Sequence, residues 1–213
     1  MRIVAINGSP RKTKNTASLL KSVCMGADTK GAETELVHLY DLKFTGCISC
    51  FKCKLPGGNS YGRCAVQDGL TPILQVAHEA DVLILGSPVY LFCETGMMRL
   101  FMERFMFQYF LYTTKKPPLS PPKKAVALLY TMNIKEQDIP AYGFNHHLDV
   151  TKQFMERLFG VCDLFICPDT KQMDDYSKYE IDYFDTTKKD RRHTEFFPQE
   201  LKRAFDFGIK LVS

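Results

Sequence analysis

The stretch that decides the fold reads Ile3-Val4-Ala5-Ile6-Asn7-Gly8-Ser9-Pro10-Arg11-Lys12-Thr13-Lys14-Asn15-Thr16. Its first residues form a short apolar run typical of a buried strand, and a helix with one apolar face is expected directly after it, with Asn15 or Thr16 as N-cap. The turn between them carries hydroxyl, amide, guanidinium and ammonium groups. A helix N-terminus offers free backbone N–H groups and the positive end of the helix dipole. The stretch therefore predicts a phosphate-binding loop at the carboxyl end of the first strand.

Three known kinds of phosphate loop do not fit residues Gly8–Thr16. The loop lacks the second glycine and the Lys-Ser/Thr pair of a P-loop NTPase, and it lacks the three glycines of a dinucleotide fingerprint. It also contains no cysteine or aspartate that could serve as a phosphatase nucleophile. What remains is a loop that binds a phosphate and performs no chemistry on it. The candidate contacts are Ser9, Arg11, Lys12, Asn15 and Thr16.

Strand-like and helix-like segments alternate along the chain. The expected strands are Arg2–Asn7, Thr34–Tyr40, Asp81–Gly86, Ala125–Tyr130 and Val161–Cys167. The expected helices are Ala17–Gly26, Thr71–Ala80, Glu94–Thr113, Asn145–Phe159 and Pro198–Leu211. This alternation predicts an α/β fold with a five-stranded parallel sheet and helices on both faces. A length of 213 residues fits a single domain over residues 1–213.

Three segments interrupt this alternation. A Gly- and Cys-rich loop spans Phe44–Asp68, and a Pro-rich linker spans Pro117–Pro122. The segment Pro168–Thr194 is expected to be an appended loop or short extra elements, and it receives no role. The basic run Lys188–Arg192 is interpreted as the solvated start of a helix.

The bulk composition is ordinary for a globular protein, with 45% hydrophobic and 24% charged residues. A net charge of +4 is too small to indicate a nucleic-acid partner. No signal peptide and no bilayer-spanning stretch is recognised, so we expect a cytoplasmic protein without a membrane partner. The eight cysteines are then expected to be thiols, metal ligands or redox groups instead of disulfides.

A second motif, Ser87-Pro88-Val89-Tyr90, leaves the expected strand Asp81–Gly86 at its carboxyl end. Pro88 stiffens this segment. Val89 and Tyr90 offer an apolar platform and backbone N–H groups to a flat heteroaromatic ring. The alternative for Tyr90 is simple packing under the next helix.

These motifs together resemble one family. Gly8-Ser9-Pro10-Arg11-Lys12-x-x-Asn15-Thr16 with Leu19 or Leu20 resembles the start of the NADPH-dependent FMN reductase and iron–sulfur flavoprotein group. The resemblance continues through Pro88-Val89-Tyr90, Gly96 and Met98–Arg104, with Arg99 for the usual Lys and Glu103 for the usual Asp, and it weakens after about Tyr130. It implies a three-layer flavodoxin-like sandwich with strand order 2-1-3-4-5, in which the first and third strands border one crevice.

The resemblance also implies a cofactor and an activity. FMN is expected to contact the phosphate-loop residues named above, a second loop with Pro88, Val89, Tyr90 and Leu91, and a third loop with Thr131 and Met132. The expected function is an NAD(P)H oxidoreductase, in which a hydride passes from nicotinamide to flavin N5 and the electrons then pass to an acceptor. That acceptor, a small molecule or a redox partner protein, is not identified by the sequence. No catalytic residue is expected, because the flavin supplies the reactivity.

A cysteine cluster provides a further signal. Cys47, Cys50 and Cys53 follow Cys-x2-Cys-x2-Cys spacing, with Cys64 as a possible fourth ligand, and they resemble the motif of the iron–sulfur flavoproteins. Three interpretations stay open: a [4Fe–4S] cluster in an electron carrier, a tetrahedral zinc site, and uncoordinated thiols beside the flavin. A non-catalytic redox or metal sensor is the matching alternative function. The remaining cysteines, Cys24, Cys93, Cys162 and Cys167, are expected to be ordinary buried residues.

The expected helix Glu94–Thr113 is apolar on two faces, which indicates burial on both sides. Met97, Leu100, Phe101 and Met106 are expected to pack on the sheet, while Met98, Met102, Phe105 and Tyr109 point elsewhere. A homodimer contact is the expected cover, and the resemblance also implies a homodimer or homotetramer. The alternative is that the C-terminal segment folds over this helix.

Overall fold

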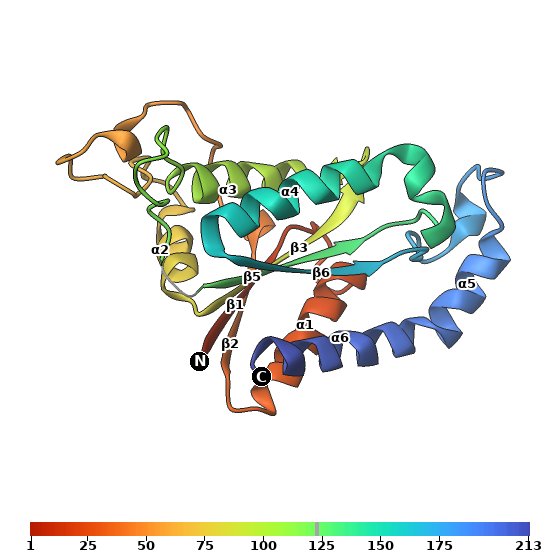
Figure 1. Ribbon diagram of the computed structural model, residues 1–213. Coiled ribbons are helices and arrows are strands. Elements are labelled where there is room, and N and C mark those ends of the chain that lie inside the picture. Colours follow the sequence, from red (N-terminus) through yellow and green to blue (C-terminus); the bar gives the residue numbers. More distant parts are fainter. Residues whose placement is uncertain (122–123) are drawn as a thin grey trace.

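The computed structural model describes residues 1–121 and 124–213, and it is built around one twisted sheet (Figure 1). Five parallel strands are β1 (Arg2–Asn7), β2 (Glu33–His38), β3 (Val82–Tyr90), β5 (Ala125–Thr131) and β6 (Val161–Cys167). Their order is β2-β1-β3-β5-β6. This confirms the predicted order 2-1-3-4-5. Pro122, the last residue of the expected linker, lies outside the described residues.

The end of β3 differs from the prediction, because the strand continues through Pro88-Val89-Tyr90. A sixth strand, β4 (Cys93–Glu94), turns back and pairs antiparallel with it, with Val89 opposite Glu94. The two turn residues, Leu91 and Phe92, have φ values of 49° and 62°. A two-residue hairpin turn of this kind requires positive φ at both positions, which costs bulky side chains about 1 kcal/mol each. The second motif is therefore one arm of a strained hairpin.

Helices cover both faces of the sheet, as predicted. They are α1 (Asn15–Asp28), α2 (Thr71–Glu79), α3 (Gly96–Phe107), α4 (Phe144–Phe159), α5 (Thr186–Glu195) and α6 (Phe197–Leu211). One apolar core lies between the sheet and α2, α3 and α4, and a second lies between the sheet and α1 and α6 (Figure 1). Neighbouring strand residues divide between the cores, with Val4 in the first and Ile3 in the second, as side-chain alternation requires. None of the helices described here is both long and apolar enough to cross a membrane.

Helix α3 is shorter than expected and rotated relative to the prediction. Its buried residues include Met98, Met102 and Phe105, which were expected to point away from the sheet, whereas Met97 and Met106 are partly exposed. Of the expected sheet-facing residues, Phe101 is fully buried. Because the helix is apolar nearly all round, its periodicity did not define one face. Thr95 instead fixes how the start of the helix is oriented. Its hydroxyl accepts a hydrogen bond from Met98 N and donates one to Gly8 O.

The segment Pro168–Thr194 contains most of helix α5, so a helix forms at the basic run Lys188–Arg192, as expected. Its basic run is not simply solvated, because Lys189 is 4% exposed and pairs with Asp169. Arg192 also lies against Asp169, at 3.2 Å, and the Lys189 ammonium donates to the backbone carbonyl of Asn133 at 2.7 Å. Helix α5 is thus anchored to the segments that follow β5 and β6.

Helices α1 and α6 pack backbone to backbone through two glycines. A Cβ on Gly26 would lie 1.9 Å from Phe205 O, and a Cβ on Gly208 would lie 1.9 Å from Val23 O. We expect Gly208→Ala to lower the free energy of unfolding by about 1–3 kcal/mol, because the helices must separate. Gly96→Ala is the matched control, since its Cβ meets nothing within 4 Å. Urea unfolding of both variants measures the difference, and equal stabilities would contradict this packing.

A buried lysine makes stability depend on pH. Lys124 is 3% exposed and its ammonium donates to Ala80 O. Burial lowers the pKa of Lys124 to about 8. Between pH 8 and about 10.5 the unfolded chain binds the proton that the folded chain has released, so stability rises with pH. The Lys124→Met variant lacks this titration. As pH rises over this range, we therefore expect the free energy of unfolding of the wild-type protein to increase, relative to that of Lys124→Met, by up to about 3 kcal/mol. Denaturant titrations of the two proteins at several pH values measure this gain, and a pH-independent difference would contradict it.

Candidate functional site

The phosphate loop and the second motif meet at the carboxyl edge of the sheet. Gly8 N donates to Gly86 O at 2.8 Å, and the Thr95 hydroxyl donates to Gly8 O at 2.7 Å. A Cβ on Gly8 would lie 2.8 Å from Met98 Cβ. Glycine at this position therefore lets the loop lie directly against α3.

The loop is held in shape by its own side chains. Asn7 accepts from Ser9 N at 3.0 Å and donates to Ser9 O at 3.2 Å, and its amide nitrogen lies 2.8 Å from His38 Nδ1. Arg11 N donates to the Ser9 hydroxyl at 3.2 Å. These bonds fix the backbone before any ligand arrives.

The start of α1 differs from the expected capping. The N-cap is Lys14, which makes no side-chain capping bond, and the first turn contains no acidic residue. Asn15 and Thr16 lie inside the helix and are buried. The Thr16 hydroxyl lies 2.8 Å from the Thr131 hydroxyl, which ties α1 to the end of β5. The helix thus presents N–H groups without a side-chain cap, the arrangement that favours an anion.

One pocket gathers residues from all three expected loops. Its lining is Ser9, Arg11, Lys14, Asn15, Thr16, Pro88, Val89, Tyr90, Thr131, Met132, Asn133, Thr170 and Gln172. Every candidate except Lys12 and Leu91 is present. The Lys12 ammonium lies 2.5 Å from Asp41, and Leu91 is 96% exposed at the hairpin tip.

The chain after β6 also contributes to this pocket, which the sequence reading missed. Arg11 donates to the carbonyl of Gln172, and Asn15 donates to the carbonyl of Lys171 at 2.7 Å. Thr170 N donates to Met132 O at 2.9 Å. These contacts connect positions more than 150 residues apart, and no local sequence pattern encodes them.

One residue that lines this pocket carries an unsatisfied polar atom. Asn133 Oδ1 is buried and has no hydrogen-bond partner within the described part of the chain. A buried acceptor without a donor costs about 1–3 kcal/mol. A ligand N–H or O–H that reached this oxygen would offset that cost.

The cysteine loop forms a second cavity. Cys47, Cys50, Cys53 and Cys64 all line it, together with Arg104 and neighbouring residues. Among the described residues, no three of these sulfurs lie within 4.8 Å of one another. Four thiolates on one zinc ion would lie about 3.8 Å apart. The four sulfurs are therefore not gathered at the spacing of a closed tetrahedral zinc site.

Three of the four remaining cysteines are ordinary buried thiols, as expected. Burial raises the pKa of Cys24 to about 11 and the pKa values of Cys162 and Cys167 to about 12. Cys93 is different, because it is partly exposed and its sulfur lies 3.2 Å from a Glu94 carboxylate oxygen. The expectation of an ordinary buried Cys93 is wrong.

Comparison with known proteins agrees with this geometry. The family model described as NADPH-dependent FMN reductase matches residues 1–155. An iron-sulfur flavoprotein of Methanocaldococcus jannaschii is 36% identical over 104 residues, which are 49% of this chain and 51% of that protein. One from Archaeoglobus fulgidus is 33% identical over 104 residues, 49% of this chain and 48% of its own. The chain spans about half the length of these curated relatives.

Solved structures show the same fold at low identity. The NAD(P)H:quinone oxidoreductase from Methanothermobacter marburgensis has a TM-score of 0.71 at 13% identity, covering 100% of this chain and 98% of that one. An FMN-dependent NADH-azoreductase from Bacillus anthracis, solved with FMN, has a TM-score of 0.66 at 13% identity and covers 100% of both chains. With the family match over residues 1–155, the chain belongs to the NADPH-dependent FMN reductase family.

Proposed function

We propose that this chain binds FMN in the three-loop pocket and acts as an NAD(P)H-dependent oxidoreductase. The observation that carries the proposal is the meeting, in one pocket, of an uncapped helix N-terminus, basic and hydroxyl side chains, and the unpaired Asn133 Oδ1. The family match over residues 1–155 supports the same cofactor.

The two ends of the pocket take different parts of the cofactor. The phosphate is bound by the N-terminus of α1 with Ser9, Arg11, Asn15 and Thr16, because these groups provide donors and positive charge. The ring is bound by β3 residues Pro88, Val89 and Tyr90 and by the β5 loop with Thr131, Met132 and Asn133. When bound, FMN accepts a hydride from NAD(P)H and returns the electrons to an acceptor.

The hairpin beside the pocket favours a flat acceptor. Tyr90 and Phe92 are each 44% exposed and Leu91 is 96% exposed. The ring of Phe92 stacks on Tyr142, with centroids 5.1 Å apart. An exposed aromatic and apolar rim of this kind offers a stacking surface to planar rings, so quinones and azo compounds are the acceptor classes we infer.

Anaerobic mixing of the FMN-loaded protein with NADPH or NADH tests the activity. We expect the visible flavin band to bleach and to return when benzoquinone is added. Bleaching by dithionite but by neither nicotinamide would contradict the proposed activity while leaving FMN binding intact.

A second candidate cofactor rests on the cysteine cavity. Four thiols line one cavity, and no three of their sulfurs lie within 4.8 Å of one another among the described residues. The buried Arg104 guanidinium donates to the Cys64 sulfur at 3.3 Å. We propose that Cys47, Cys50, Cys53 and Cys64 hold an iron–sulfur cluster, whose chemistry is the transfer of single electrons. The curated relatives are named iron-sulfur flavoproteins.

Reconstitution with iron and sulfide without oxygen tests the cluster. We expect about four iron atoms per chain, and loss of the broad visible absorption in Cys53→Ser. Cys24→Ser is the matched control, since Cys24 is equally buried but lies in α1. Equal iron content in both variants would contradict the assignment.

We also propose a homodimer through the groove between α3 and α4. The groove is a cavity of about 340 Å³ lined by Met106, Phe107, Val150 and Phe154 among others. Arg99 and Glu103, one turn apart on α3, also line it, so a two-fold-related copy can pair each charge with its opposite. Light scattering after size-exclusion chromatography measures the mass. A monomer at micromolar concentration would contradict this interface.

A further inference from the structure

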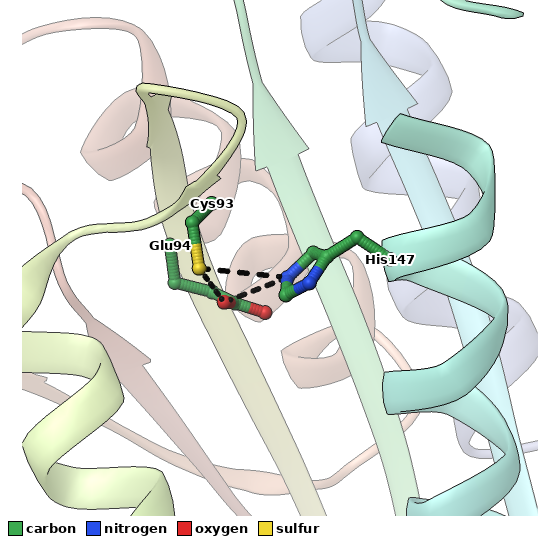
Figure 2. A group of neighbouring side chains, drawn as sticks. All are labelled: Cys93, Glu94 and His147. Atoms are coloured by element: carbon green, nitrogen blue, oxygen red, sulfur yellow. Dashed lines mark hydrogen bonds and ion pairs between the residues drawn. The ribbon is translucent and has the colours of Figure 1, made fainter. Parts of the chain in front are cut away.

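Three side chains outside the FMN pocket point toward one another between the β3–β4 hairpin and α4 (Figure 2). The Cys93 sulfur lies 3.2 Å from Glu94 Oε2 and 3.7 Å from His147 Nε2. Glu94 Oε2 lies 2.9 Å from the same His147 nitrogen. Among the described residues these atoms form a set of potential metal ligands within 4.8 Å of one another.

The arrangement does not fit a cysteine nucleophile with a histidine base. In such a relay the carboxylate contacts one ring nitrogen and the nucleophile contacts the other. Here the sulfur and the carboxylate oxygen both lie against Nε2. Three donor atoms of different types that converge on one point are instead the pattern of a metal centre.

We propose that Cys93 Sγ, Glu94 Oε2 and His147 Nε2 bind one divalent cation of the borderline class, represented by Zn²⁺. Tetrahedral zinc with ordinary bond lengths places sulfur about 3.5 Å from nitrogen and from oxygen, and nitrogen about 3.3 Å from oxygen. The separations of 3.7, 3.2 and 2.9 Å lie within about 0.4 Å of those values. The site therefore needs little rearrangement to close around the ion.

Surrounding residues hold the ligands in place. The Tyr130 hydroxyl donates to the other Glu94 oxygen at 2.5 Å, and Glu94 is 4% exposed. The Phe144 ring stacks on the His147 ring, with centroids 5.8 Å apart. Outer contacts of this kind orient metal ligands and raise affinity.

The site is open on one side. The His147 side chain is 27% exposed and Cys93 is partly exposed, so an ion reaches it from solvent. Three protein ligands leave the fourth tetrahedral position for water or for an oxygen of a second molecule. The ion would also tie β4, directly after the strained Leu91–Phe92 turn, to α4. This inference does not depend on FMN binding.

Calorimetric titration with Zn²⁺ alone tests the site. The titration uses the full chain carrying Cys47→Ser and Cys50→Ser, which removes two thiols of the cysteine loop. We expect one Zn²⁺ per chain, with affinity reduced at least about 100-fold by His147→Gln. His146→Gln is the matched control, because His146 is the exposed neighbour on the same helix, and we expect it to bind Zn²⁺ unchanged.

Titration with Co²⁺ reads out the ligands independently. We expect a thiolate-to-cobalt charge-transfer band that Cys93→Ser abolishes. Tyr130→Phe, which keeps all three ligands, should weaken Zn²⁺ binding about tenfold. Three results would each overturn the proposal: no Zn²⁺ binding by the chain that carries only Cys47→Ser and Cys50→Ser, an unchanged Zn²⁺ affinity on adding His147→Gln, or a cobalt spectrum without the thiolate band.

Discussion

Arg104→Ala is expected to lower the free energy of unfolding by about 3–5 kcal/mol, because it removes one partner of a buried ion pair. Arg104 is 1% exposed in the interior of α3. Its Nη1 lies 2.8 and 2.6 Å from the two Asp68 oxygens and 3.2 Å from Thr45 O. Its Nη2 donates to Val66 O at 2.9 Å. One guanidinium therefore holds both ends of the cysteine loop against α3.

Chemical denaturation measures this loss of stability. Two further variants serve as controls, one at an exposed arginine and one that keeps the charge of Arg104. Arg191→Ala removes an arginine of α5 whose side chain is 70% exposed, and it should change stability by less than about 0.5 kcal/mol. Arg104→Lys keeps the charge but not the planar set of donors, so its stability should fall between those of Arg104→Ala and Arg191→Ala. Equal stabilities of Arg104→Ala and Arg191→Ala would contradict the role of Arg104 in holding the cysteine loop.

The same ion pair has a pH signature. Burial raises the pKa of Asp68, but the hydrogen bonds from Arg104 and from backbone N–H groups outweigh it, so the pKa lies below its usual value. The stabilisation is therefore present above the ordinary aspartate pKa of about 3.9 and is lost as pH falls through the lower folded value.

Arg11→Ala is expected to weaken FMN binding by about 10- to 150-fold. The reason is the loss of a charge-assisted phosphate contact worth about 1.5–3 kcal/mol. Lys12→Ala is the matched control, since Lys12 is the next residue but pairs with Asp41 outside the pocket. We expect less than about a threefold change for Lys12→Ala. Fluorescence titration with FMN measures both, and equal losses would place the phosphate elsewhere.

Much of the fold was predictable because its central parallel strands, β1, β3 and β5, are buried on both faces. Runs such as Ile3–Ile6 and Val126–Leu129 contain only apolar residues, because both of their faces are buried, so they are recognisable from composition alone. The strand order came from the family resemblance, since periodicity does not encode which strands are neighbours. The extension of β3 into a hairpin was missed, because Leu91 and Phe92 are not residues that favour positive φ.

That residues of the three expected segments meet in one pocket was predictable, because they lie at or just after the carboxyl ends of the parallel strands β1, β3 and β5. The contributions of Thr170 and Gln172 were not, because they reach the pocket from the far end of the chain. The Cys93 cluster was missed for the same reason. Cys93 and Glu94 are adjacent, but His147 lies 54 residues after Cys93, and no spacing rule joins them.

A direct comparison of FMN with riboflavin tests the central claim, that the Ser9–Thr16 loop at the N-terminus of α1 binds the phosphate of a flavin. The two ligands share the ring and differ in the phosphate. We expect fluorescence titration to show one FMN per chain, with riboflavin bound at least about 30-fold more weakly, a difference of about 2 kcal/mol. Equal affinity for the two flavins, or no binding of either, would contradict it.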